Sequence, residues 1–205
     1  MTDDAAADIA GGDGLDRTLT WPNAVTAVRL ALIPLYVWLL FWTPHQLAAG
    51  LLLGTLGATD WVDGYLARRL HQVTTLGKVL DPVADRVLVI TAVLTIAIYG
   101  AVPWWFAGLT LARELLVSLA VLLLASLGAA RIDVLWIGKA GTFALMTAYP
   151  LLLIADGPAS WQTFLKVVAW GIGIVGLVLA WGAALSYVGP ARKALADGRR
   201  ARHLG

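Results

Sequence analysis

The stretch DWVDGYLARRLHQVTTLGKVLDPVAD occupies residues 60–85 and carries four aspartates at helical spacings. Asp60 and Asp63 are three positions apart, and Asp81 and Asp85 are four apart. Residues at these separations share one face of an α-helix, so each pair can direct its carboxylates at one point. Two such pairs facing each other predict an oxygen-rich site for a hard divalent cation, either Mg²⁺ or Mn²⁺.

The composition around this stretch is that of an integral membrane protein. The 205 residues are 60% hydrophobic and 14% charged, and the mean hydropathy is +0.78. A soluble domain cannot bury so large an apolar fraction, whereas a bilayer accommodates it. The chain contains no cysteine, which excludes disulfides, thiolate nucleophiles and cysteine-based metal sites. We expect membrane lipids around the protein and no nucleic-acid partner.

Six apolar segments are long enough to cross a bilayer, so we expect an all-α fold with six transmembrane helices. We expect a flexible tail over residues 1–20, a transmembrane domain over residues 21–190 and a basic tail over 191–205. A long polar connection is expected from 68 to 80, with Asp81 as the N-cap of the next helix. The expected spans are roughly 24–42, 47–67, 82–100, 103–127, 134–155 and 162–188.

The basic residues predict the orientation of these spans. Lysine and arginine are found before the first span, in every second connection and after the last span, while the other three connections contain none. The positive-inside rule then places both termini and the aspartates on the cytoplasmic side of the inner membrane. Lys166 lies near the opposite end of the last span and is expected to snorkel outward.

The spacing of residues 60–85 resembles the signature D-x2-D-G-x2-A-R-x8-G-x3-D-x3-D of the CDP-alcohol phosphatidyltransferases. The segment WPNAVTAVRLALIP at 21–34 resembles the phosphatidylglycerophosphate synthase and cardiolipin synthase branch, as do LARELLVS and IGKAGTFALM further along the chain. The resemblance covers about residues 20–190. The signature positions are filled by Asp60, Asp63, Gly64, Ala67, Arg68, Gly77, Asp81 and Asp85.

The resemblance implies a homodimer of six-helix subunits, each with a cytoplasmic cavity that holds two divalent ions. The donor would be CDP-diacylglycerol, whose phosphatidyl group passes to an acceptor hydroxyl while CMP leaves. The implied metal ligands are the four aspartates, and Asp85 is also the implied general base. Arg68 would lie near the diphosphate. The implied CDP-binding residues are Asp60, Gly64, Ala67, Arg68 and Gly77.

Two other interpretations of the aspartates are considered. Arg68, Arg69 and Arg86 are close in sequence, so an ion-pair network without metal is one alternative. A transporter or channel, in which the aspartates bind a permeating cation, is the other. The acidic residues cluster near one interface and no second acidic layer continues across the spans, which argues against transport.

Three basic residues within the apolar segments, Arg29, Arg113 and Lys139, are expected to bind an anionic acceptor. One alternative for Arg113 is an ion pair with Glu114, although adjacent helical residues point in different directions. Lys139 has the alternative of snorkelling to the nearby interface.

The acceptor is predicted from a missing arginine. In the phosphatidylglycerophosphate synthases that this chain resembles, a second arginine lies seven residues after the glutamate of the A-R-E motif, and Val121 occupies that position here. A phosphomonoester dianion should need more positive charge than a phosphodiester. We therefore expect phosphatidylglycerol as acceptor, giving cardiolipin, with glycerol-3-phosphate as the alternative. Inositol-phosphate and serine acceptors are disfavoured because the flanking pattern of those branches is absent.

Overall fold

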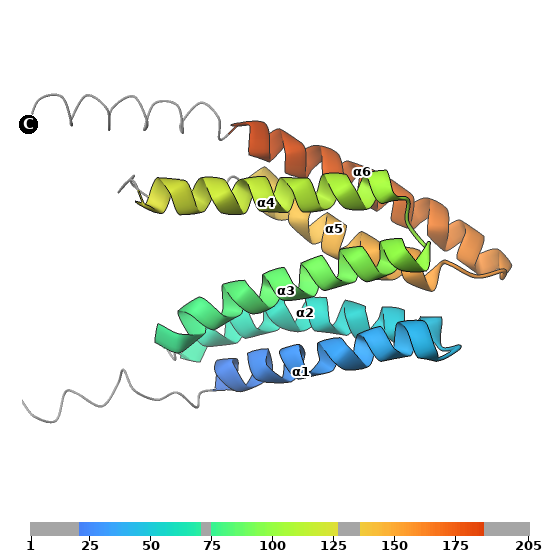
Figure 1. Cartoon of the computed structure of the whole chain (residues 1–205), viewed down its shortest axis with the longest axis horizontal. Helices are drawn as coiled ribbons and strands as arrows, with labels where there is room; N and C mark the ends of the chain where they lie inside the picture. Colours follow the sequence, from blue (N-terminus) through green and yellow to red (C-terminus); the bar gives the residue numbers. More distant parts are fainter. Residues whose placement is uncertain (1–20, 71–74, 127–135, 187–205) are drawn as a thin grey trace, which may run out of the picture. The chain divides into compact units, whose positions relative to one another are not determined.

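The computed structural model describes the backbone of residues 21–70, 75–126 and 136–186, and the side chains of 24–59, 83–120 and 136–186. Within these ranges the fold is all-α, with six helices (Figure 1). Their bounds lie close to the expected spans. The helices are α1 (Trp21–Trp42), α2 (Gln46–Leu70), α3 (Thr75–Tyr99), α4 (Trp104–Ser126), α5 (Trp136–Ile154) and α6 (Ser160–Ser186).

Two predictions about the start of α3 are wrong. This helix begins at Thr75, so Asp81 lies inside it and is not its N-cap. Helix α2 continues to Leu70, so most of the expected polar connection is helical. Apolar residues are interleaved with the polar ones here, and the two helices extend beyond the apolar segments that a bilayer requires. Hydrophobicity alone therefore predicts an end of α2 that is too early and a start of α3 that is too late.

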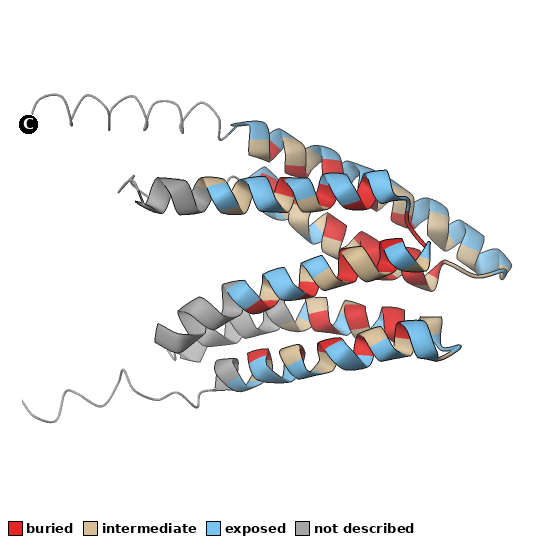
Figure 2. Cartoon of the chain, in the orientation of Figure 1, coloured by how far each residue is buried: buried red, intermediate tan, exposed pale blue. Residues whose placement is uncertain are grey.

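The chain divides into two compact units, Met1–Thr91 and Ala92–Gly205. In the first unit, α1 packs against α2 through a stripe of buried residues at alternating spacings of three and four. This spacing places every member on one helix face. Figure 2 shows buried (red) and exposed (pale blue) residues alternating along α1, because the helix face opposite the stripe is exposed. The stripe consists of Thr26, Arg29, Ile33, Tyr36 and Leu40 on α1, and of Ala49, Leu53 and Leu56 on α2.

In the second unit, small residues bring α5 and α6 into backbone contact. A Cβ atom added to Gly141 would lie 2.6 Å from the backbone nitrogen of Ala180. One added to Gly176 would lie 2.9 Å from the Cβ atom of Ala144 and 3.2 Å from the carbonyl oxygen of Gly141. Close approach of this kind is how helices associate in membranes, where lipid is as apolar as leucine. The α5–α6 pair is thus tightly packed.

The turn between α3 and α4 is set by Gly100, which has a positive φ of 97°. The amide of Ala101 donates to the carbonyl of Ile96 over 3.2 Å, and the amide of Gly100 donates to that of Ala97 over 3.2 Å. This pairing is a Schellman motif, which ends a helix and favours glycine at the left-handed position. Pro103 then directly precedes α4.

Aromatic packing joins α4 to the α5–α6 pair. The ring of Phe106 is fully buried. Its centroid lies 5.5 Å from that of Tyr149 and 5.1 Å from that of Trp170. The hydroxyl of Tyr149 donates to Oγ1 of Thr110 over 2.9 Å. Aromatic pairs at these separations add to the stability that burial provides.

Three helices among the described residues are long and apolar enough to cross a membrane: Ala24–Trp42, Trp136–Ile154 and Ser160–Ser186. Their outward faces expose large apolar side chains, such as Trp38, Phe143 and Val178. Such surface is stable when lipid covers it. The protein is therefore a helical membrane protein.

Candidate functional site

The four aspartates lie on two consecutive helices. Positions 60 and 63 are in α2, and positions 81 and 85 are in α3, so each pair keeps the spacing that shares a helix face. Of these four, only Asp85 lies in the ranges whose side chains are described. The side chains of the remaining signature residues lie outside these ranges. No group of three or more metal-ligating side chains is found within the described ranges, and three of the predicted ligands fall outside them.

Asp85 is held by an arginine from α1. Nη1 of Arg29 donates to Oδ1 of Asp85 over 2.7 Å. The side chain of Arg29 is 1% exposed, whereas that of Asp85 is 38% exposed. A buried guanidinium needs an anionic partner because it has lost its hydration. The arginine is thus fixed in the core, and the carboxylate stands at the edge of it.

A second buried arginine lies on α4. Nη1 of Arg113 donates to Oε2 of Glu114 over 2.9 Å and to Oγ1 of Thr142 over 3.1 Å. Oγ1 of Thr142 in turn donates to the carbonyl oxygen of Gly138 over 3.0 Å. The ion pair with Glu114, which the sequence left open, is therefore present. The long side chains meet although the two residues are adjacent in sequence.

On the other edge of the Arg113 guanidinium, Nε is not satisfied by the described residues. Nε is buried and has no hydrogen-bond partner among the described residues. A buried donor in this state costs about 1–3 kcal/mol, so a native protein usually gives it a partner. An oxyanion that accepts from Nε would remove this cost. Arg113 is therefore a residue with capacity for a ligand.

Lys139 differs from both arginines because its side chain is exposed on α5. Within the described ranges, no hydrogen bond or ion pair joins it to Arg113. Its neighbour in the sequence, Gly138, accepts the hydrogen bond of Thr142 in the Arg113 network. The expected task of Lys139 and Arg113, binding an acceptor, stays a prediction.

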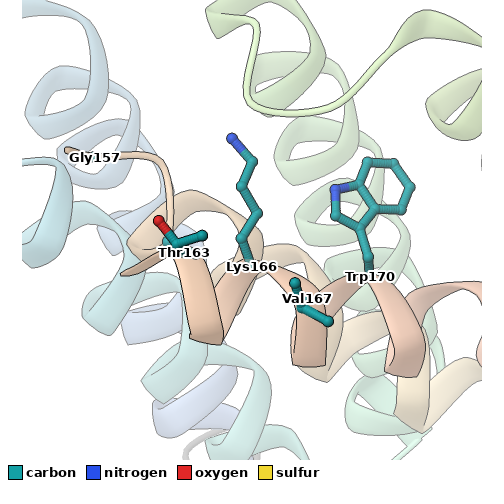
Figure 3. Close-up of a pocket in the computed structure, with 6 residues that line it drawn as sticks. Gly157, Thr163, Lys166, Val167 and Trp170 are labelled. Carbon is teal, nitrogen blue, oxygen red and sulfur yellow. The ribbon is translucent and has the colours of Figure 1, made fainter. Parts of the chain in front are cut away.

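A cavity of about 460 Å³ lies at the turn between α5 and α6 (Figure 3). Lys166 and Trp170 line it from one side of α6, four residues apart. Nζ of Lys166 donates to Oδ1 of Asp156 over 2.9 Å. This ion pair ties α6 to the preceding turn, and the expected outward snorkelling of Lys166 stays a prediction.

The fold and the Arg29–Asp85 pair define a class: a helical membrane protein with buried charge beside a carboxylate-rich motif, as expected of a membrane enzyme. Comparison with known proteins identifies the family. Residues 19–185 match the family model of CDP-alcohol phosphatidyltransferase. The chain belongs to the CDP-alcohol phosphatidyltransferase family, and it is a transferase of phospholipid biosynthesis. The transporter interpretation is therefore set aside.

Two relatives represent the two branches that the sequence resembles. The cardiolipin synthase (CMP-forming) of Streptomyces coelicolor is 37% identical over 183 residues, covering 87% of this chain and 85% of the relative. The CDP-diacylglycerol–glycerol-3-phosphate 3-phosphatidyltransferase of Escherichia coli K12 is 38% identical over 186 residues, covering 86% and 97%. Enzymes of the family use a CDP-alcohol and an alcohol acceptor in the membrane, and generally require a divalent metal ion. These two sequence identities do not show whether this chain uses phosphatidylglycerol or glycerol-3-phosphate as acceptor.

Two features of the site were not predicted from the sequence. Arg29, which pairs with Asp85 from 56 positions earlier, was not among the arginines considered as partners of the aspartates. Thr142 was not singled out, since a lone threonine in an apolar helix carries no chemical signal. Its spacing of 29 residues from Arg113 becomes informative only when α4 and α5 are known to pack together.

Proposed function

We propose that this protein is a CMP-forming cardiolipin synthase, which transfers the phosphatidyl group of CDP-diacylglycerol to a hydroxyl of phosphatidylglycerol. The residue seven positions after Glu114 carries this proposal, because Val121 stands where a second arginine would add positive charge. Glu114 also offsets the charge of Arg113. A site with less positive charge suits the monoanionic phosphodiester of phosphatidylglycerol better than the dianion of glycerol-3-phosphate.

The chemistry of transfer would rest on residues of the motif. Asp60, Asp63, Asp81 and Asp85 form a donor set of hard oxygens, which suits two Mg²⁺ or Mn²⁺ ions. The ions, when bound, would offset the negative charge of the diphosphate. Asp85 would take the proton of the attacking hydroxyl, since its partly exposed carboxylate is held in place by Arg29. The cytidine diphosphate group would lie against Asp60, Gly64, Ala67, Arg68 and Gly77.

Arg113 and Lys139, two of the three basic residues in the apolar segments, would bind the acceptor. Arg113 offers an unsatisfied Nε, and Lys139 offers an exposed ammonium on the neighbouring helix. Arg29 stands beside the proposed base, so it would serve the acceptor by orienting Asp85. We also propose a homodimer, as the family resemblance implies. The basic connections favour an orientation in the inner membrane with both termini and the site on the cytoplasmic side.

One competition experiment tests the acceptor. Purified protein is given CDP-diacylglycerol, Mg²⁺ or Mn²⁺, and equal amounts of phosphatidylglycerol and glycerol-3-phosphate. Cardiolipin should be the dominant product by chromatography, with one CMP released for each molecule formed, and a chelator should stop both. A dominant phosphatidylglycerophosphate product would favour the second candidate, which the Escherichia coli relative represents. Failure to release CMP with either acceptor would refute the transferase proposal itself.

A further inference from the structure

We propose that Thr142 is a positioning residue: it holds one end of the Arg113 guanidinium so that the opposite edge faces the phosphate of the acceptor. This inference rests on the proposed function only in that it takes a phosphate-bearing acceptor as given. Both candidate acceptors meet that condition. It concerns the α4–α5 contact and does not involve the aspartate motif.

The anchored end of the guanidinium is Nη1. This nitrogen carries two N–H donors, and the structure provides two acceptors for them, Glu114 at 2.9 Å and Thr142 at 3.1 Å. Glu114 belongs to the same helix as Arg113, so it moves with the arginine. Thr142 belongs to α5 and is the only one of the two that fixes Nη1 relative to another helix.

Thr142 is itself fixed. Its hydroxyl donates to the carbonyl oxygen of Gly138 over 3.0 Å, which leaves the oxygen lone pairs for Nη1. The hydroxyl thus acts as acceptor and donor in one chain of hydrogen bonds, and each bond polarises the next. An apolar residue of the same shape would leave the carbonyl of Gly138 in its helical bond and remove only the contact with Arg113.

The opposite edge consists of Nε and Nη2, whose N–H bonds are parallel in the planar group. This fork matches two oxygens of a phosphate. Nε has no partner among the described residues, and Arg113 is only 7% exposed, so the fork lies in a dry setting where a bound anion is held strongly.

A glycine leaves room beside this fork. A Cβ atom at position 138 would lie 3.8 Å from Nη2 of Arg113 and 3.2 Å from the Cβ atom of Ala183. A methyl group here would be in van der Waals contact with Nη2, so glycine keeps a side chain away from this nitrogen. The glycine beside Nη2 and the unpartnered Nε concern the same edge of the guanidinium.

The test is Thr142→Val, which keeps the branched shape and removes the hydroxyl. The KM for the acceptor should rise about tenfold, as expected when a hydrogen bond that orients a charged group is lost. The KM for CDP-diacylglycerol should stay within about twofold. Thr142→Ser should restore the acceptor KM. An unchanged acceptor KM in Thr142→Val, or a Ser variant as impaired as the Val variant, would overturn the inference.

Thr147 provides a matched control on the same helix. Its hydroxyl donates to the carbonyl oxygen of Phe143 over 2.9 Å, as that of Thr142 does to Gly138. Thr147→Val therefore removes an equivalent hydroxyl without removing a bond to Arg113, and both KM values should be unaffected. An equal rise of the acceptor KM in this control would attribute the Thr142 effect to α5 as a whole and refute positioning.

A double-mutant cycle shows whether Thr142 acts through the arginine. In an Arg113→Lys background the fork is absent, so Thr142→Val should cause no further rise in the acceptor KM. Additive effects would contradict the inference. All measurements use whichever acceptor the unaltered enzyme prefers. A preference for glycerol-3-phosphate would then refute the proposed function and still leave the Thr142 result to decide this inference.

Discussion

Two buried arginines, Arg29 and Arg113, are neutralised in different ways. Arg29 pairs with Asp85, which is 56 positions away on another helix. Arg113 pairs with Glu114, the next residue in the chain. The first ion pair exists only when α1 and α3 pack together, whereas the second accompanies α4 wherever it lies. The difference indicates two tasks. Arg29 orients a carboxylate of the motif, and Arg113 carries a positive charge that its neighbour Glu114 offsets.

The distinction also concerns what each arginine contacts. Arg29 is 98% buried and directs Nη1 at a carboxylate of the proposed metal site. Arg113 directs Nη1 at Glu114 on its own helix and at Thr142 on α5. If the two were interchangeable acceptor ligands, substitutions at both should raise the acceptor KM alike. If their tasks differ, substitution of Arg29 should lower kcat and substitution of Arg113 should raise the acceptor KM.

The strongest perturbation removes the carboxylate that Arg29 holds. Asp85→Asn should lower kcat by about a thousandfold, because the base is lost while the amide oxygen can still accept from Arg29. Metal and donor binding should largely survive. The rate of CMP release, with donor binding measured separately, checks this. Asp156→Asn, which alters the Asp156–Lys166 pair, should leave kcat within about twofold. An Asp85→Asn enzyme that retains its turnover would remove Asp85 from the role of base.

Substitution of Arg29 sharpens the comparison directly. Arg29→Gln should lower kcat by about a hundredfold with little change in the acceptor KM, since a misplaced base slows the chemical step. Arg29→Lys keeps the charge but loses the planar fork, so it should recover part of the rate. Lys166→Gln removes a cation from the other ion pair and serves as control. A rise in acceptor KM with kcat unchanged would make Arg29 an acceptor ligand and erase the contrast with Arg113.

The smallest expected effect is a change of preference. Glu114→Gln keeps an oxygen that can accept from Nη1 of Arg113 but removes the offsetting charge. The use of glycerol-3-phosphate relative to phosphatidylglycerol should then rise about fivefold, as expected for one unit charge near a partly buried phosphate. Product ratios from the competition assay measure it. An unchanged ratio would show that Glu114 does not set the charge that the acceptor meets.

The sequence predicted the helices well because span length is dictated by the bilayer. Expected and observed bounds differ little in α1, α4 and α5. The start of α3 was misplaced because the polar residues before Asp81 gave no hydrophobic signal, although their backbone is helical. Family resemblance predicted the motif residues, and the family model confirms the family. The roles of those residues stay predictions.

The partners of the arginines could not be predicted in the same way. A salt bridge across 56 positions depends on how α1 packs, and one sequence holds no signal for that pairing. The Arg113–Glu114 pair was foreseen as an alternative, but the rule that adjacent residues diverge on a helix argued against it. That rule describes Cβ directions, and both side chains are long enough to turn back toward each other. Thr142 was identified only through its contact with Arg113 of α4.

The backbone contact between α5 and α6 limits where lipids can travel. The amide nitrogen of Ala180 stands where a methyl group on Gly141 would have to be, so an acyl chain has no passage between these two helices. A lipid substrate that reaches the site sideways from the bilayer must therefore pass other helices. The same contact keeps Gly138 and Thr142 on a rigid support, so movement of acyl chains need not disturb the groups that we propose face the acceptor.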